Sequence, residues 1–514
     1  MRITTARRIA QGFFFALFVW LCVVSAVGTG WSQWRGWPIR WFLQLDPLVA
    51  LGTVLTTHSL YPALGWALGI VALTLLFGRV FCGWLCPFGA LHQFTGWLAR
   101  LRQRPKQRMQ SNEYHPAQTL KYYLLAALLA AAVSPLGGRA LASLQTGLLD
   151  PIPLVHRSVN LAVLSLLGAG SAGDRFYTGA GLIGLLFLGF VLLNLVVPRF
   201  YCRFLCPLGA LLGVLGRFAP WGISVAKAEC TECRLCDRDC EGACRPSGPF
   251  RASECLMCMN CMDDCPTKHS VGYAPRPSPA GEIPLPEISR RGFLASVALG
   301  LTAAPLTRLG GATARNWPAG LIRPPGAVSE EEFLARCVKC CECVRVCPTN
   351  AIQPAGFEFG WEALLTPAMN YRIGTSGCQL DCIACGHACP TGAIRPLSLE
   401  EKRGGGSAGD LPIRLGLASV DRGRCLPWAT GRPCIVCEET CPVSPKAITV
   451  DEIDQQRADG TSVRLQRPVV DPSRCIGCGV CEHECPLSGM RGIRVVADNE
   501  SRQSEHSVLL RHEN

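Results

Sequence analysis

Cysteine spacing constrains this chain more than any other feature. Two runs of Cys-x2-Cys-x2-Cys-x3-Cys lie close together, at Cys230, Cys233, Cys236 and Cys240, and at Cys255, Cys258, Cys261 and Cys265. In two-cluster bacterial ferredoxins three close thiolates hold three corners of a [4Fe–4S] cube, and the other run supplies the fourth. We therefore expect one cluster on Cys230, Cys233, Cys236 and Cys265, and a second on Cys255, Cys258, Cys261 and Cys240. Zinc sites usually show separated ligand pairs, so these runs favour iron–sulfur clusters.

Four further cysteine motifs follow residue 315, and each ends in Cys-Pro. They are Cys337, Cys340, Cys343 and Cys347; Cys378, Cys382, Cys385 and Cys389; Cys425, Cys434, Cys437 and Cys441; and Cys475, Cys478, Cys481 and Cys485. With the first two runs they predict six [4Fe–4S] clusters, which use 24 of the 31 cysteines. Spacing leaves the pairing open, since the first motif can pair with the second or with the fourth. Cys341 is expected to be a spare, and 413–421 to form a strand.

The first 220 residues are expected to lie in a membrane. Hydrophobic residues make up 49% of the 514 residues and charged residues only 17%, which is unusually apolar. Apolar runs at 13–27, 62–81, 120–133 and 179–197 approach the ~20 residues that a helix needs to cross a bilayer. Basic residues beside these runs place the N-terminus, the 98–118 loop and the segment after residue 199 in the cytoplasm. The net charge of +12 therefore reflects topology, and no nucleic-acid partner is expected.

This half of the chain is an internal duplication. The sequence FCGWLCPFGAL at 81–91 matches YCRFLCPLGAL at 201–211, and LQLDPL at 43–48 echoes GLLDPI at 147–152. The predicted fold is an α-helical membrane domain of four helices, built from two repeated hairpins, followed by α+β ferredoxin-like modules.

Each repeat carries a Cys-x3-Cys-Pro motif, with Cys82 and Cys86 in the first and Cys202 and Cys206 in the second. Cysteines four apart share one face of a helix, so pseudo-symmetry is expected to bring the four together as a metal or redox site. The alternative is that they are small packing residues before a helix-ending proline. Spacing leaves open whether such a site holds iron, zinc or a dithiol.

Asp46 and Asp150 precede prolines at equivalent positions of the repeat. Quinol oxidation needs proton acceptors beside an apolar slot, so both are candidate acceptors. His58 and His156 lie nearby in sequence and are weaker candidates. The alternative is that Asp-Pro only starts a helix or a turn.

Five regions follow from these patterns. Residues 1–220 form the membrane domain, 221–270 a cytoplasmic two-cluster module, and 271–288 a Pro-rich, extended linker. At 289–314 Ser-Arg-Arg-Gly-Phe-Leu precedes a weakly apolar run, which is similar to a twin-arginine export signal. We expect it to remain as a fifth helix at 292–307, although Ala-Thr-Ala at 312–314 leaves cleavage open. Residues 315–514 then form a periplasmic four-cluster domain.

Residues 1–270 resemble NapH-type membrane ferredoxins, and residues 285–490 resemble NapG-type ferredoxins with a twin-arginine signal and four clusters. The MauN and MauM pair is similar in plan, and the NosR and CcoG families share the Cys-x3-Cys-Pro membrane pattern. This chain differs by fusing two parts that are usually separate, which would hold them at one-to-one stoichiometry.

The resemblance implies a quinol dehydrogenase component of the bacterial inner membrane. It would pass electrons from the quinone pool to a periplasmic reductase or cytochrome, of which nitrate reductase is the best-known example. The alternatives are an assembly factor that keeps a periplasmic metalloenzyme reduced, or a donor in methylamine or nitrous-oxide metabolism. A bilayer core of ~30 Å separates the predicted cytoplasmic and periplasmic clusters. A quinol carrier, the four-cysteine site or two separate paths could each account for that gap.

Overall fold

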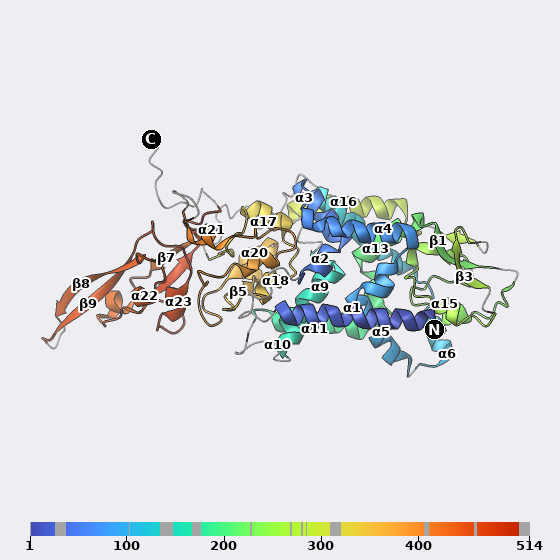
Figure 1. The fold of residues 1–514 in the computed structure, drawn as a ribbon, viewed down its shortest axis with the longest axis horizontal. Helices are drawn as coiled ribbons and strands as arrows, with labels where there is room; N and C mark the ends of the chain where they lie inside the picture. The colour runs from blue at the N-terminus through green and yellow to red at the C-terminus, as the bar shows by residue number, and fades with distance from the viewer. Residues whose placement is uncertain are drawn as a thin grey trace.

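The computed structural model describes residues 2–25, 38–101, 103–133, 147–166, 175, 177–226, 229–267, 270–278, 281–283, 285–308, 320–405, 411–456 and 460–502. A helical part lies between two smaller cysteine-rich parts, so the molecule is elongated (Figure 1). The possible cleavage sequence at 312–314 and most of the 404–410 glycine segment lie outside the described residues.

The helical part includes five helices near the predicted membrane spans. They are α1 (Ile3–Ser25), α4 (Ala67–Phe77, preceded by a 3-10 turn at Pro62–Trp66), α7 (Leu120–Val133, preceded by a 3-10 turn at Pro116–Thr119), α11 (Ala180–Leu193) and α16 (Arg290–Arg308). Among the described residues, two helices are long and apolar enough to cross a membrane by length and composition, Ile3–Ser25 and Pro116–Val133. Those at Pro62–Phe77 and Ala180–Leu193 are apolar but shorter.

α1 reaches from one cysteine-rich part to the other. Near its start, Arg7 donates to Asn260 of the first part at 3.2 Å. Near its end, Val24 shares a buried cluster with Val346 and Ala384 of the second part. A helix rises about 1.5 Å per residue, so these two contacts, from Arg7 to Val24 of α1, are separated by roughly 25 Å.

The two repeats break their helices at matching places. α4 ends at Gly78, whose positive φ of 78° suits glycine, and α11 ends before Pro198. A π-turn at Phe81–Leu85 and then α5 (Pro87–Arg100) follow in the first repeat, and α12 (Phe200–Phe204) and α13 (Pro207–Leu215) in the second. Cys86 and Cys206 have extended backbones and are N-caps. The expectation that each cysteine pair shares one continuous helical face is therefore wrong, because proline starts a new helix directly after the second cysteine.

Short helices begin at the two Asp-Pro sequences. α2 (Trp41–Gln44) leads into α3 (Pro47–Thr57), whereas α9 (Pro151–Ser158) continues through a π-turn at Val159–Val163 into α10 (Leu164–Leu166). Asp46 accepts from Leu48 N at 2.9 Å, and Asp150 accepts from Ile152 N at 3.4 Å. Both aspartates therefore act as N-caps, which satisfies amides that a helix start leaves free.

The first cysteine-rich part has two small strand pairs. β1 (Trp221–Val225) pairs with β3 (Val271–Pro275), so the predicted linker begins as a strand. β2 (Phe250–Arg251) pairs in parallel with β4 (Glu282–Ile283). The short helices α14 (Leu235–Arg238) and α15 (Asn260–Asp263) each follow the second cysteine of a motif.

The second cysteine-rich part repeats this plan twice. Its first unit has α17 (Glu330–Arg336), α18 (Glu342–Arg345), α19 (Gly360–Ala363), α20 (Ala384–Ala388) and α21 (Leu399–Arg403), with β5 (Ile352–Pro354) antiparallel to β6 (Pro367–Met369). Its second unit has α22 (Val436–Glu439), α23 (Val480–Glu484), β7 (Leu417–Val420) antiparallel to β10 (Ile493–Val496), and the hairpin β8 (Ile448–Gln456) and β9 (Ser462–Val470). β7 lies within the strand predicted at 413–421.

α16 packs against α7. Ser289 N donates to the Tyr123 hydroxyl at 2.9 Å near the start of both helices. Further along, Gly300 packs so closely on Ala127 that a Cβ would meet its carbonyl oxygen. Small residues allow this close approach of two helices. The segment with the twin-arginine pattern is therefore a helix that lies against the helical part.

Candidate redox sites

The first cysteine-rich part brings its motifs together in the crossed manner of a ferredoxin. Cys240 lies within electrostatic range of Cys255, Cys258 and Cys261. Cys236 groups with Cys230 and Cys233. We define set B as Cys255, Cys258, Cys261 and Cys240. Set A is Cys230, Cys233 and Cys236 together with Cys265, the fourth ligand that the spacing predicts. Set B is buried, whereas Cys233 of set A is exposed.

The second cysteine-rich part forms four more sets, three of which line a small apolar cavity. Set C is Cys337, Cys340, Cys343 and Cys389; set D is Cys378, Cys382, Cys385 and Cys347; set E is Cys425, Cys434, Cys437 and Cys485; and set F is Cys475, Cys478, Cys481 and Cys441. The first motif therefore pairs with the second, and the third with the fourth. Of the two pairings that spacing allowed, the structure has the first.

These sets suit iron–sulfur clusters better than single metal ions. Among the described residues, no three His, Cys, Asp or Glu side chains are close enough to hold one metal ion. A cubane is larger, and it needs four thiolates around a cavity, as sets C, E and F provide. Burial raises the pKa of Cys337 to about 11 and that of Cys478 to about 12, so iron must displace protons there.

Backbone amides point at several of these sulfurs. Ile394 N lies 3.4 Å from Cys389 Sγ, and Ala418 N lies 3.4 Å from Cys475 Sγ. Such hydrogen bonds are one means by which a protein sets cluster potential. Cys341 lies beside set C, and its sulfur faces the carbonyl oxygens of Lys339 and Leu365. That orientation agrees with its expected role as a spare.

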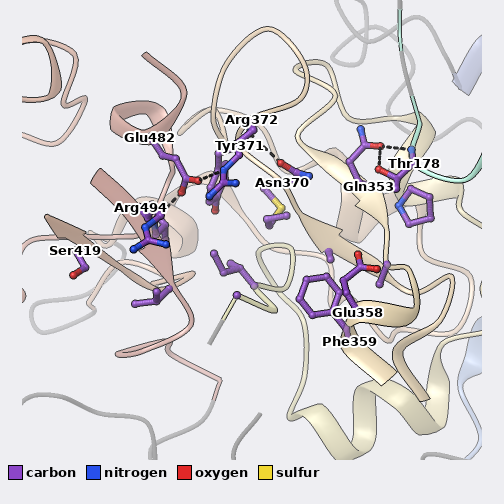
Figure 2. A pocket seen from close by; sticks show the side chains of 18 of the residues that line it. Thr178, Gln353, Glu358, Phe359, Asn370, Tyr371, Arg372, Ser419, Glu482 and Arg494 are labelled. Atoms are coloured by element: carbon purple, nitrogen blue, oxygen red, sulfur yellow. Dashed lines mark hydrogen bonds and ion pairs between the residues drawn. The ribbon is translucent and has the colours of Figure 1, made fainter. Parts of the chain in front are cut away.

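Sets D and F meet where the two units join. Cys378 N donates to Cys478 O at 2.7 Å, and the Tyr371 hydroxyl donates to Gly477 O at 2.7 Å. A cleft of about 710 Å³ opens beside this joint (Figure 2). Within it Glu482 accepts from Arg372 at 3.1 Å and from Val495 N at 2.8 Å. These contacts fix the two units against each other, so the sets follow the order C, D, F, E away from the helical part.

The four repeat cysteines, Cys82, Cys86, Cys202 and Cys206, come together between the two repeats. Cys86 is within electrostatic range of Cys82 and Cys202, and Cys206 is within range of the other three. Two buried arginines, Arg79 and Arg199, flank this group, and each stands three residues before the first cysteine of its repeat. Sequence reasoning missed both arginines, although they lie at the same position of the duplicated segment.

Asp46 and Asp150 also come together. Both side chains are fully buried, and the two carboxyl groups lie within electrostatic range of each other. His58 does not join them, because it is the exposed C-cap of α3. His156 instead lies 3.6 Å from Glu342, beside set C.

Set B lies against the repeat cysteines. Arg79 donates to Ser253 O at 2.8 Å, and Trp84 donates to Met257 O at 2.9 Å. Glu241 lies at this junction and contacts Arg199 at 2.7 Å. Burial would raise the pKa of Glu241, but nearby Arg199, Arg7 and Arg100 outweigh it and hold the pKa well below its usual range.

Set C lies against the aspartate pair at the opposite end. Arg157 donates to Lys339 O at 3.1 Å, Asn160 donates to Glu342 at 2.8 Å, and Thr56 donates to Ala335 O at 3.1 Å. Tyr201 links this end to the repeat cysteines, since its neighbour is Cys202 and its hydroxyl donates to Leu149 O. One buried core runs from Cys340 of set C to Cys86 and Cys206.

Crossed cysteine sets on small α+β units, arranged in series, define an iron–sulfur electron-transfer protein of the ferredoxin type. Family models describe iron–sulfur binding in the helical part and in the second cysteine-rich part. One described as "4Fe-4S binding domain" matches 59–105 and 179–225, the segments that hold the four repeat cysteines. A "4Fe-4S dicluster domain" matches 432–488, and a second "4Fe-4S binding domain" matches 333–353. The dicluster match contains most of sets E and F.

Curated relatives place it more narrowly. The methylamine utilization ferredoxin-type protein MauM of Methylophilus methylotrophus is 36% identical over 218 residues, which are 41% of this chain and 87% of the relative. MauM of Methylorubrum extorquens is 35% identical over 40% of this chain and 89% of its own length. The chain therefore belongs to the MauM family of ferredoxin-type proteins.

The chain is also similar to longer proteins. The regulatory protein NosR of Pseudomonas aeruginosa is 31% identical over 48% of this chain. The match spans about a third of NosR, 34% of its length. No solved structure matches the chain.

Proposed function

We propose that this protein is a membrane-bound relay that takes electrons from quinol and delivers them to a periplasmic reductase or cytochrome. Six [4Fe–4S] clusters on sets A to F carry the electrons, with the first cysteine-rich part in the cytoplasm and the second in the periplasm. The observation that carries the proposal is the serial arrangement of the sets, with the first cysteine-rich part at one end of the helical part and the second at the other end (Figure 1).

The surface of the helical part supports a membrane location. α11 exposes Leu182, Leu185 and Leu186, each with more than half of its surface accessible, and α4 exposes Leu68. A helix that is apolar on all sides suits lipid rather than water. The basic N-terminus and α6 (Pro105–Ser111) lie at the same end as the first cysteine-rich part, which supports a cytoplasmic location for that end (Figure 1).

The aspartate pair supports quinol as the donor. Quinol releases two protons and two electrons when it becomes quinone. Asp46 and Asp150 offer buried carboxyl oxygens to receive a proton, and set C lies just beyond them to receive electrons. Electrons then pass through sets D and F to set E. Cys425, Cys434 and Cys437 of set E are only half-buried, so a partner can approach this set.

The identity of that partner is proposed as a class. A reductase such as nitrate reductase fits the resemblance noted from sequence, whereas the MauM relatives favour a partner in methylamine utilization. Either receives single electrons at set E.

The test uses detergent-purified protein prepared without oxygen. Iron and sulfide are counted, a quinol is added, and cluster reduction is followed by low-temperature electron paramagnetic resonance. At least about 24 irons per chain and rapid reduction are expected for six or more cubanes. Full iron content with no reduction by quinol would overturn the proposal and favour an assembly factor that keeps a metalloenzyme reduced.

A further inference from the structure

The four repeat cysteines occupy the gap in the series, between set B and set C. Arg199 lies within electrostatic range of both Cys202 and Cys258 of set B. Arg79 likewise reaches Cys206 and Cys255 of set B. On the other side, Tyr201 connects Cys202 to the Asp150 region that adjoins set C. A centre at this position would divide a membrane crossing that is otherwise about as long as α1.

Two of the four sulfurs already receive hydrogen bonds. Cys86 accepts from Gly89 N at 3.4 Å, and Cys206 accepts from Gly209 N at 3.1 Å. These cysteines cap α5 and α13, so both sulfurs lie at the positive ends of helices. That position favours the negative charge that a metal-bound cysteine sulfur carries.

The arginines point to an anionic occupant. Arg79 and Arg199 are each only 2% exposed. Among the described residues, Nη1 of Arg199 and Nε of Arg79 have no hydrogen-bond partner. Nη1 of Arg199 lies 3.6 Å from the position that a Cβ of Gly89 would take, next to the cap formed by Cys86. Arg199 already pairs with Glu241 through Nε, whereas Arg79 donates to the carbonyl oxygen of Ser253 and forms no ion pair among the described residues. A buried cation is costly unless a negative group lies beside it, so Arg79 in particular favours an anion at this position.

We propose that Cys82, Cys86, Cys202 and Cys206 ligate a seventh iron–sulfur cluster, shared by the two repeats and held between Arg79 and Arg199. This inference rests on the proposed electron-transfer function. The cluster's thiolates and sulfides supply the negative charge that the arginines face. In each step one reduced neighbouring cluster loses one electron, the seventh cluster gains it, and the seventh cluster then loses it to the next acceptor without bond formation.

Two other occupants fit less well. Zinc needs its ligands close around one ion, and no described group has that geometry. All four cysteines are free thiols rather than disulfides. Neither zinc nor an isolated thiol group would carry single electrons between sets B and C, whereas four thiolates are the usual ligands of [2Fe–2S] and [4Fe–4S] clusters.

The test compares the whole protein with a Cys86→Ser, Cys206→Ser double variant, purified without oxygen. Iron, sulfide and zinc are counted per chain. The wild type should hold about two or four irons more than the ~24 of six cubanes, and the double variant should lose that excess alone. Cys22→Ser is the matched control, because Cys22 is a buried cysteine of α1 outside every set.

The outcomes separate this inference from the proposed function. Three metal counts would overturn the seventh cluster: about 24 irons in the wild type, unchanged iron in the double variant, or one zinc per chain. Each does so whether or not quinol reduces the clusters. The seventh cluster is supported if quinol still reduces set C in the double variant but electrons no longer equilibrate between set C and sets A and B. If quinol reduces no cluster in the wild type, the proposed function fails and the iron count still decides the seventh cluster.

The arginines give a second readout that needs no cysteine change. Arg199→Gln should lower the midpoint potential of the seventh cluster, since the reduced and more negative state loses a neighbouring cation. Arg199→Lys should largely restore it. A potential that is the same in both variants and the wild type would contradict the placement of Arg199 beside the cluster.

Discussion

Asp46 and Asp150 cap two different helices, and their carboxyl groups lie close together in the interior. Each side chain is fully buried, and one oxygen of each has no donor among the described residues. Two neighbouring buried carboxylates repel each other when both are charged, so their surroundings favour a proton on one of them. The pair can accept a further proton while keeping its place at the two helix N-termini.

The first prediction concerns this pair. Asp46→Asn or Asp150→Asn should slow reduction by quinol about 10²-fold or more, because the acceptor of the quinol proton is changed. The double variant should be little slower than either single variant, since the two groups act as a unit. Stopped-flow absorbance measures the rate. Reduction by dithionite, which needs no proton acceptor, should be unchanged, and equal slowing with both reductants would contradict the assignment.

A second prediction tests the crossed ligand sets. Cys389→Ser should remove or alter the cluster on set C, although Cys389 belongs to the second motif. Cys347→Ser should instead affect set D, whose other members lie in the second motif. Paramagnetic resonance of the reduced protein resolves the two signals. Cys341→Ser is the matched control and should leave both signals intact, because its sulfur faces carbonyl oxygens.

The third prediction concerns the junction at Glu241. This buried carboxylate contacts Arg199 at 2.7 Å and Arg7 at 3.5 Å. Glu241→Gln leaves these cations without their partner, so we expect a loss of about 3–5 kcal/mol in the stability of the junction. Hydrogen exchange of α15 measures it. Glu113→Gln, which alters an exposed pair with Arg234, should have almost no effect, and similar exchange in both variants would refute the role.

The fourth prediction is a pH dependence in the second cysteine-rich part. Burial would raise the pKa of Glu330, but Arg323 and Arg502 outweigh it, so the pKa is lowered. A lowered pKa stabilises the folded protein above the unfolded value of about 4.3, and this stabilisation is lost as pH falls through the folded pKa. The wild type should therefore melt higher than Glu330→Gln at pH 7, and the difference should shrink on acidification.

Thermal melting followed by circular dichroism provides the measurement. Glu332→Gln is the control, because Glu332 pairs with Arg336 on the surface, with 38% of its side chain exposed. That pair contributes under about 1 kcal/mol. A difference between wild type and Glu330→Gln that stays constant from pH 7 to acid would contradict the assigned ion pair.

Sequence reasoning reached furthest where ligand spacing carries the information. The assignment of Cys240 to the second motif follows from the spacing of a two-cluster ferredoxin. There three close thiolates hold three corners of the cube, and the other motif supplies the fourth ligand. The partner of Cys337 could not be found in this way, since both candidate motifs offer a Cys-Pro at the same offset. Tertiary contacts between the two motifs decided it, since Cys389 lines the same cavity as Cys337, Cys340 and Cys343.

The helical part shows the opposite limit. Apolar composition located its helices, but it did not show that they end at Gly78 and before Pro198. Nor did it show that Cys86 and Cys206 would become caps of new helices. Hydropathy averages over a window, whereas a helix break depends on one glycine or proline. The contact of Asp46 with Asp150 joins positions far apart in the sequence, and only tertiary structure reveals it.

The order of the sets along the molecule has a consequence for damage by oxygen. Sets C, D, F and E lie in single file, so an inner set has no neighbour that can replace it. If the cluster on set D were lost, the cluster on set C would stay reduced because it has no acceptor. The clusters on sets F and E would stay oxidised and intact. In the proposed relay, one oxidised cubane would therefore stop electron transfer as completely as its removal. The cysteines of set C, the first acceptor in that relay, are buried and so less accessible to oxygen.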